Sequence, residues 1–213
     1  MTKKTNITIK NIRKDYEEIV FNFQENDIFM NIIMLWLLAD KIDETDGESD
    51  ISFVVIDDKG KQENHYLELT WDSDKYYNSL TEEDEYADDI LIWLLAKIIK
   101  CNVKKKSISS FDQEINYEEL EKDNVLFFDI VRFDTFYNIK SLANLSLRMK
   151  ETEYSEDIPY SIIDKTHWKT NYILKSINPE EQIYNNSLTK EDEYADYILV
   201  SFAEIIIGEC EKK

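Results

Sequence analysis

An acidic segment that occurs twice is the part of the chain with the clearest chemical potential. It reads SLTEEDEYADDIL from Ser79 and SLTKEDEYADYIL from Ser187. Carboxylates at this density form a negative surface that attracts basic proteins, and tyrosine is enriched at protein interfaces. We therefore predict a partner-binding role for these side chains. The predicted partner-binding residues are the acids and tyrosines of both copies: Glu82, Glu83, Glu85, Asp88, Asp89, Glu191, Glu193, Asp196, Tyr86 and Tyr194.

Local helix structure is the competing explanation for the same acids. The spacing predicts a helix capped by Thr81, with Asp84 three residues later as the partner of a capping box, and Asp192 in the same place in the second copy. Acids in a first helical turn also complement the helix dipole, by about 0.3–1 kcal/mol each. Asp88 and Asp89 fall beyond the first turn of that predicted helix. They are therefore the acids that the helix explains least.

No catalytic, cofactor or metal motif accompanies the acidic segments. The two histidines are His65 and His167, and aligning the copies places His65 opposite Asn171, so neither histidine is shared. No nucleophile elbow, zinc-protease motif, P-loop or dinucleotide fingerprint is present. We therefore predict a protein that is not an enzyme, with no catalytic residues and no cofactor.

The loop 43–50 resembles a calcium-binding loop only superficially. If Gly47 takes the sixth position of an EF-hand loop, Ile42 and Phe53 occupy the first and twelfth positions, where carboxylates are required. Cys101 and Cys210 lack the spacing of a zinc site. We predict no metal site. Two reduced thiols are favoured over a disulfide, which the sequence leaves open.

The overall charge narrows the class of partner. The chain of 213 residues has 45 acids against 25 basic residues, a formal charge of −20. Such a field repels nucleic acid and anionic membranes, so we expect neither direct nucleic-acid binding nor membrane binding. The apolar segment 32–39 has eight residues, whereas a bilayer span needs about 20. The N-terminal residues have no signal-peptide pattern, and a cytoplasmic protein is expected, bacterial or, if phage-encoded, in the host cytoplasm.

An internal repeat organises the whole chain. Between 79–99 and 187–207, 13 of 21 residues are identical at a constant offset of 108. Upstream, Asp27–Ile32 aligns with Asp134–Ile139 at an offset of 107. A match of this length predicts a tandem duplication. The predicted domains are 1–101 as the first repeat, 102–112 as a linker and 113–213 as the second repeat.

Each repeat is predicted to be a small α+β unit. In the first, Ile19–Phe23 is a strand, and Asp27 caps a helix that runs to about Ile42. Ile51–Ile56 and Tyr66–Trp71 follow as strands that form a hairpin. With the helix that Thr81 caps, the fold class is α+β, a tandem repeat of two similar small domains. Each is a short antiparallel sheet covered by two helices.

Helical spacing also predicts which side chains are buried. The last helix of each repeat has an apolar stripe, formed by Ala87, Ile90, Leu91, Leu94 and Ile98 in the first and by Ala195, Ile198, Leu199, Phe202 and Ile206 in the second. Trp36 and Trp93 lie within apolar helices and are predicted to be core residues. Trp71 and Trp168 lie near strand ends and are candidate interface anchors.

Three functions fit this combination of features. The first is an inhibitor that neutralises a basic protein, best represented by a bacterial immunity protein against a nuclease-like toxin. The chain resembles immunity proteins in size, acidity and lack of motifs, not in particular residues. The alternative is a phage or mobile-element anti-defence protein, anti-CRISPR or anti-restriction, that acts as a nucleic-acid mimic. The second alternative is an acidic adaptor or scaffold. The partner, the oligomeric state and the number of partners bound stay open.

Overall fold

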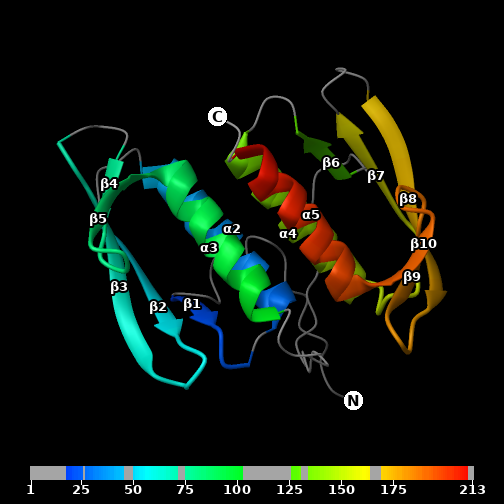
Figure 1. The fold of residues 1–213 in the computed structure, drawn as a ribbon, viewed down its shortest axis with the longest axis horizontal. Helices are drawn as coiled ribbons and strands as arrows, with labels where there is room; N and C mark the ends of the chain where they lie inside the picture. Colours follow the sequence, from blue (N-terminus) through cyan, green and yellow to red (C-terminus); the bar gives the residue numbers. More distant parts are fainter. Residues whose placement is uncertain are drawn as a thin grey trace, which may run out of the picture.

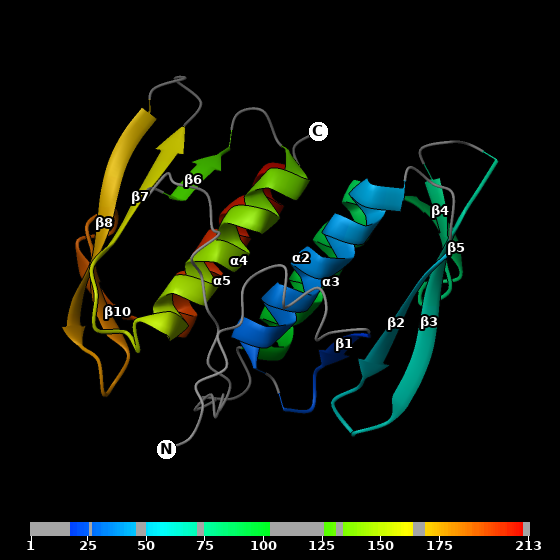
Figure 2. The same ribbon diagram turned by 180° about the vertical axis from the view of Figure 1, so that it is seen from behind.

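Two five-stranded sheets flank a central layer of helices (Figures 1 and 2). The structure is a computed structural model, and it describes residues 18–25, 27–45, 50–71, 75–102, 126–130, 134–163 and 169–210. The first half comprises β1 (Ile19–Asn22), α2 (Ile28–Thr45), β2 (Ile51–Ile56), β3 (Gln62–Leu69), β4 (Lys75–Asn78), β5 (Glu83–Tyr86) and α3 (Ala87–Asn102). The second comprises β6 (Leu126–Asp129), α4 (Thr135–Glu151), β7 (Ile158–Ile163), β8 (Lys169–Asn178), β9 (Ile183–Asn186), β10 (Glu191–Tyr194) and α5 (Ala195–Cys210). The α+β class is confirmed.

The sheets are mixed rather than purely antiparallel. Their strand orders are β1-β2-β3-β4-β5 and β10-β9-β8-β7-β6. β1 pairs with β2 in parallel, and β6 pairs with β7 in the same way, whereas the remaining pairs are antiparallel. The parallel pairs follow from the connections, because a helix between two neighbouring strands returns the chain to the same end of the sheet. The prediction of an antiparallel sheet was therefore wrong for the first strand of each sheet, which pairs in parallel.

The first strand of each half is attached to the helix that follows it by an asparagine. The amide of Asn31 in α2 exchanges two hydrogen bonds with the backbone of Asn22, at 2.9 and 3.1 Å. Asn138 in α4 forms the same two bonds with the backbone of Asp129, at 3.0 and 2.9 Å. Asp27 caps α2 as predicted, because its carboxylate accepts from the backbone N–H of Phe29 and Met30. In both halves an asparagine side chain therefore joins the first strand to the following helix in the same way.

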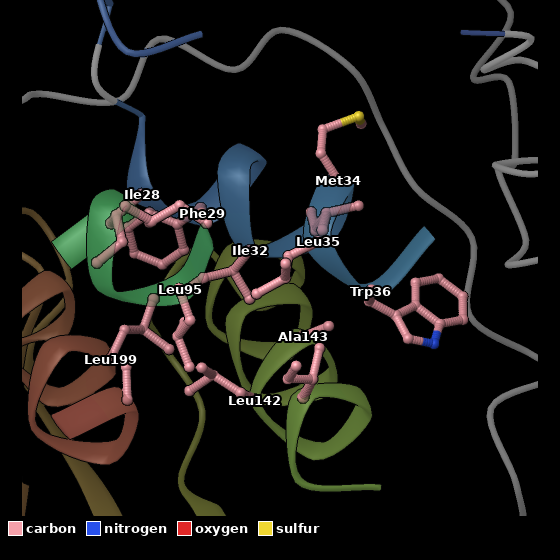
Figure 3. Close-up of a cluster of buried hydrophobic side chains, with 14 of the residues drawn as sticks. Ile28, Phe29, Ile32, Met34, Leu35, Trp36, Leu95, Leu142, Ala143 and Leu199 are labelled. Atoms are coloured by element: carbon pink, nitrogen blue, oxygen red, sulfur yellow. The ribbon is translucent and has the colours of Figure 1, made fainter. Parts of the chain in front are cut away.

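The four described helices share one hydrophobic core between the sheets. α2 packs against α4 and α3 packs against α5, so each pair of helices covers its own sheet and the other pair (Figures 1 and 2). In Figure 3, Ile32 and Leu35 of α2 lie close to Leu142 and Ala143 of α4. Every residue from Asn31 to Ala39 is buried. Apart from Asn31, this buried stretch of α2 is apolar around the whole helix, as expected for a helix buried on more than one side.

One ion pair joins the two halves at the edge of this core. Lys150, at the end of α4, lies with its Nζ 3.4 Å from Oδ2 of Asp27 and 4.7 Å from the ring centre of Phe29. Burial lowers the pKa of Lys150, and the Asp27 carboxylate opposes that shift. Asp43 occupies the position in α2 that corresponds to Lys150. The pair is therefore present on one side of the helical interface, and the sequence does not repeat it on the other.

Most of the predicted core is confirmed. The stripes of α3 and α5 are buried as predicted, with Ala87 partly buried. Trp36 is 5% exposed, but Trp93 is 37% exposed, so the prediction of a core Trp93 was wrong. Leu94 and Leu95 face the core instead, and Trp93 lies on the solvent side of α3 with Lys97 Nζ 4.9 Å from its ring centre. The predicted linker falls almost entirely in residues 103–125, outside the described part of the chain.

Candidate functional site

The acidic segment begins as a β-hairpin, not as a helix. Residues Glu83–Tyr86 form β5, which pairs with β4, and helix α3 begins only at Ala87. The predicted capping box of Thr81 and Asp84 is therefore wrong. The hydroxyl of Thr81 instead donates to the Glu85 carboxylate at 2.9 Å. Glu82 has a φ of 61°, and Lys190 has a φ of 65° at the same point of the second hairpin, which gives both turns the left-handed residue that reverses the chain.

A buried asparagine organises each hairpin from within. The side-chain amide of Asn78 donates to Oε2 of Glu85 at 2.7 Å, and Asn186 donates to Oε2 of Glu193 at 2.8 Å. The side-chain oxygen of Asn78 also accepts from the backbone N–H of Leu80. A buried amide needs such partners because an unpaired polar group in the core is costly. Glu85 and Glu193, predicted to bind a partner, therefore already hold the hairpin together.

The acids at the helix starts have a role in the fold that the sequence did not indicate. Asp88 and Asp89 lie in the first turn of α3, and Asp196 lies in the first turn of α5. At these positions the carboxylates complement the helix dipole. Asp88 and Asp89 were predicted to lie beyond the first turn, because a helix capped by Thr81 starts five residues before α3 does. The acids that the fold uses least are Glu82, Glu83 and Glu191, which are exposed on the two hairpins.

The structure does not bring the two acidic segments together. β5 and β10 are edge strands of different sheets, and the sheets lie on opposite sides of the helices (Figures 1 and 2). The predicted residues thus form two separate clusters, one at each end of the molecule. Each cluster has an exposed tyrosine. Tyr86 is 49% exposed with Lys75 Nζ 4.9 Å from its ring centre, and Tyr194 is 40% exposed beside Tyr197.

A row of acidic and aromatic side chains on the first sheet was missed by the sequence reasoning. Glu68, Tyr77 and Asp84 are register partners on the adjacent strands β3, β4 and β5. Leu67 and Tyr76 point into the core, so their neighbours in the row point to the opposite face of the sheet. The ring of Tyr66 lies 6.1 Å from that of Tyr77, on the same face. We call these four residues, Tyr66, Glu68, Tyr77 and Asp84, the outer row.

The second sheet has different side chains at the corresponding positions. Its register partners are Lys175, Asn185 and Asp192, and Ile173 takes the place of Tyr66. The amide of Asn185 donates to the carboxylate of Asp192 at 2.8 Å. The backbone around the two rows is the same, because Tyr66 and Ile173 both donate their N–H to a serine hydroxyl, of Ser79 and Ser187, at 2.8 Å. The halves thus agree in backbone and differ in this surface.

The histidines and cysteines are the remaining residues with reactive side chains. His65 lies against Phe53, with its Nδ1 3.5 Å from the Ser79 hydroxyl. Its counterpart in the register is Tyr172, which stacks on Tyr160, and not Asn171 as the sequence alignment placed it. His167 and Trp168 lie outside the described residues. Cys101 is partly buried in the last turn of α3, and Cys210 ends α5.

Neither a metal-binding cluster nor a membrane span is found in the described part of the chain. Within those residues no group of three or more His, Cys, Asp or Glu side chains is placed to hold a metal ion. None of the helices described there combines the length and the apolar character needed to cross a bilayer. Comparisons with protein-family models, curated proteins and solved structures found no match to this chain.

Proposed function

We propose that the protein is a non-enzymatic, acidic binding protein that neutralises a basic protein, and that it acts as a bacterial immunity protein against a nuclease-like toxin. The observation that carries the proposal is the pair of acidic hairpins. Each places exposed carboxylates on an edge strand or in the turn before it, Glu82 and Glu83 in one and Glu191 in the other, and each edge strand bears an exposed tyrosine. With a formal charge of −20, the chain attracts basic partners over a distance, and the tyrosines supply contact area.

We further propose that the chain arose by tandem duplication of one sheet-plus-helix unit. Hydrogen bonds that recur in both halves support this proposal in addition to the repeated sequence. The Asn78–Glu85 bond recurs as Asn186–Glu193, and the bonds of Asn31 to β1 recur as those of Asn138 to β6. Duplication explains why equivalent acidic hairpins occur at both ends. It also gives the protein two candidate contact surfaces, one acidic hairpin at each end of the molecule.

The nucleic-acid mimic is the competing proposal, and the arrangement of the hairpins bears on it. A mimic of duplex DNA needs negative charges in rows that follow the phosphates, about one charge per 1.7 Å of axis. The two hairpins lie on opposite sides of the helical layer rather than along one face (Figure 1). The immunity proposal requires no such alignment, because one basic partner can contact one hairpin. The adaptor proposal requires no basic partner.

The test is capture of a basic partner by the intact chain and by charge variants. Replacing Glu82, Glu83 and Glu191 with Gln removes three exposed charges from the hairpins. Replacing Glu25, Glu180 and Glu181 with Gln removes three exposed charges elsewhere and is the matched control. We expect the chain to retain a basic nuclease from its source organism and to inhibit it. The hairpin variant should bind at least about tenfold more weakly than the control.

Other outcomes separate the alternatives. A captured protein that binds DNA in competition with this chain, with affinity that falls steeply with salt, supports the nucleic-acid mimic. Equal binding by the hairpin variant and the control removes the hairpins from the contact. The absence of any basic partner at low salt leaves the adaptor.

A further inference from the structure

We propose that the outer row of the first sheet is a binding site for an arginine side chain in an extended, basic segment of the partner protein. The inference rests on the proposed function, because it names the part of the acidic surface that recognises a cation. Its elements are two exposed carboxylates, Glu68 and Asp84, on either side of Tyr77, with Tyr66 against that ring.

The chemistry of the row matches a guanidinium group better than a lone ammonium. Arginine stacks on an aromatic face and at the same time donates paired hydrogen bonds to carboxylates. Cα partners on adjacent strands lie about 5 Å apart, so one planar group above Tyr77 is within reach of a carboxylate on each side. A cation already lies against the neighbouring ring of this face, since Lys75 Nζ is 4.9 Å from the centre of Tyr86. That contact shows that the face accommodates a cation over a tyrosine.

Comparison of the two halves distinguishes residues that the fold requires from residues that only the first sheet has. The hairpin bond between asparagine and glutamate is present in both halves, as the structural need for it would require. The outer row differs at three of its four positions. Tyr66, Glu68 and Tyr77 correspond to Ile173, Lys175 and Asn185, and the remaining acid, Asp192, accepts a hydrogen bond from Asn185. The second sheet thus has Lys175 at the position of Glu68, and this lysine would repel a cationic ligand that Glu68 attracts.

No described helix covers this face of the first sheet, since α2 and α3 both lie on its other side (Figures 1 and 2). Tyr66 is 41% exposed, and Glu68 and Asp84 are exposed. An extended peptide lying across β3, β4 and β5 can therefore contact the row without any change in the core. The negative charge of the row selects a basic segment and disfavours an acidic one.

The experiment uses the full chain and an octa-arginine peptide as the probe. Binding is followed by backbone amide NMR shifts and by calorimetry at moderate salt. We expect shifts at Tyr66, Tyr77 and Asp84 and none at Ile173 and Asn185. The double variant Tyr66→Ile with Tyr77→Asn leaves the net charge unchanged and makes the row resemble the second sheet. It should bind the peptide about tenfold more weakly.

A reciprocal variant is expected to gain binding, which misfolding would not produce. Replacing Ile173 with Tyr, Lys175 with Glu and Asn185 with Tyr builds the outer row on the second sheet, and we expect it to create a second peptide site. Unchanged affinity in the Tyr66→Ile, Tyr77→Asn variant, or equal shifts on both sheets, would overturn the inference and leave the proposed function standing on charge alone. No binding of octa-arginine to the wild-type chain would count against both.

Discussion

The side-chain amide of Asn78 donates to the carboxylate of Glu85 at 2.7 Å and so links the two strands of the β4–β5 hairpin. Replacing Asn78 with Ala removes the donor to a charged acceptor and the acceptor for the Leu80 N–H. We expect a loss of about 2–3 kcal/mol in the free energy of unfolding, measured by chemical denaturation. Asn64→Ala, on the exposed side of β3, is the control and should change stability by less than about 0.5 kcal/mol.

The corresponding change in the second half is expected to cost more. The side-chain oxygen of Asn186 accepts from the Tyr160 hydroxyl at 2.7 Å as well as from the Leu188 N–H. Phe53 is the register counterpart of Tyr160, so Asn78 has no such phenol above it. Asn186→Ala should therefore destabilise the protein by about 1 kcal/mol more than Asn78→Ala. Equal effects of the two variants would contradict the role given to Tyr160.

The starting point of α3 illustrates what a single sequence can and cannot predict. β1, β2 and α2 were predictable, because apolar runs with clear periods determine them and Asp27 supplies a cap. Strand β5 was not. Its three acids, Glu83, Asp84 and Glu85, have weak strand propensity, and the pairing with β4 and the Asn78 bond that support the strand are not visible in the sequence. The outer row was missed for the same reason, since its members share a face only once the register of β3, β4 and β5 is known.

The central helical layer should make the two halves unfold together. Leu142 of α4 is fully buried and lies in the cluster with α2 shown in Figure 3. Leu142→Ala is expected to lower the free energy of unfolding by about 2–5 kcal/mol, through lost burial and the cavity left behind. Hydrogen exchange should then accelerate by a similar factor in both sheets. Faster exchange confined to the second sheet would show that the halves unfold separately.

The ion pair between the halves should contribute through the lysine stem as well as its charge. Lys150→Ala removes both the contact with Asp27 and the cover over Phe29, and we expect a loss of about 1–2 kcal/mol in thermal or chemical unfolding. Lys150→Met keeps the apolar stem and should lose less. Lys140→Ala, an exposed position on the same helix, is the control. If Met and Ala cost the same, the stem does not contribute.

Alkaline pH should weaken the fold through a buried tyrosine. Burial raises the pKa of Tyr184 to about 12, and the nearby Thr152 side chain opposes part of this shift. Within the described residues the Tyr184 hydroxyl makes no hydrogen bond of ordinary length and angle. A folded pKa above the unfolded value of about 10 means that the neutral phenol favours folding. This contribution is present below pH 10 and is lost as the pH rises towards 12, by about 2 kcal/mol in total.

The Tyr184→Phe variant tests this linkage. It should be about as stable as the wild type at pH 7, because the buried hydroxyl that it removes makes no hydrogen bond of ordinary length and angle within the described residues. Its stability should fall less between pH 9 and pH 11.5, as measured by urea denaturation at each pH. Part of the decline will persist, because burial also raises the pKa of Tyr154 and Tyr160. Tyr197→Phe, at an exposed position, should follow the wild type.

The helical interface has a consequence for how the two ends of the molecule can evolve. Two identical units joined through α2 and α3 would carry the same outer row on both sheets, and every substitution would appear twice. Asp43 in place of Lys150 would also leave such a pair without the cation that meets Asp27. Joining the units in one chain removes that symmetry. One sheet can then acquire the outer row while the other keeps its acidic hairpin without that row, so two similar halves of one chain can differ in what they bind.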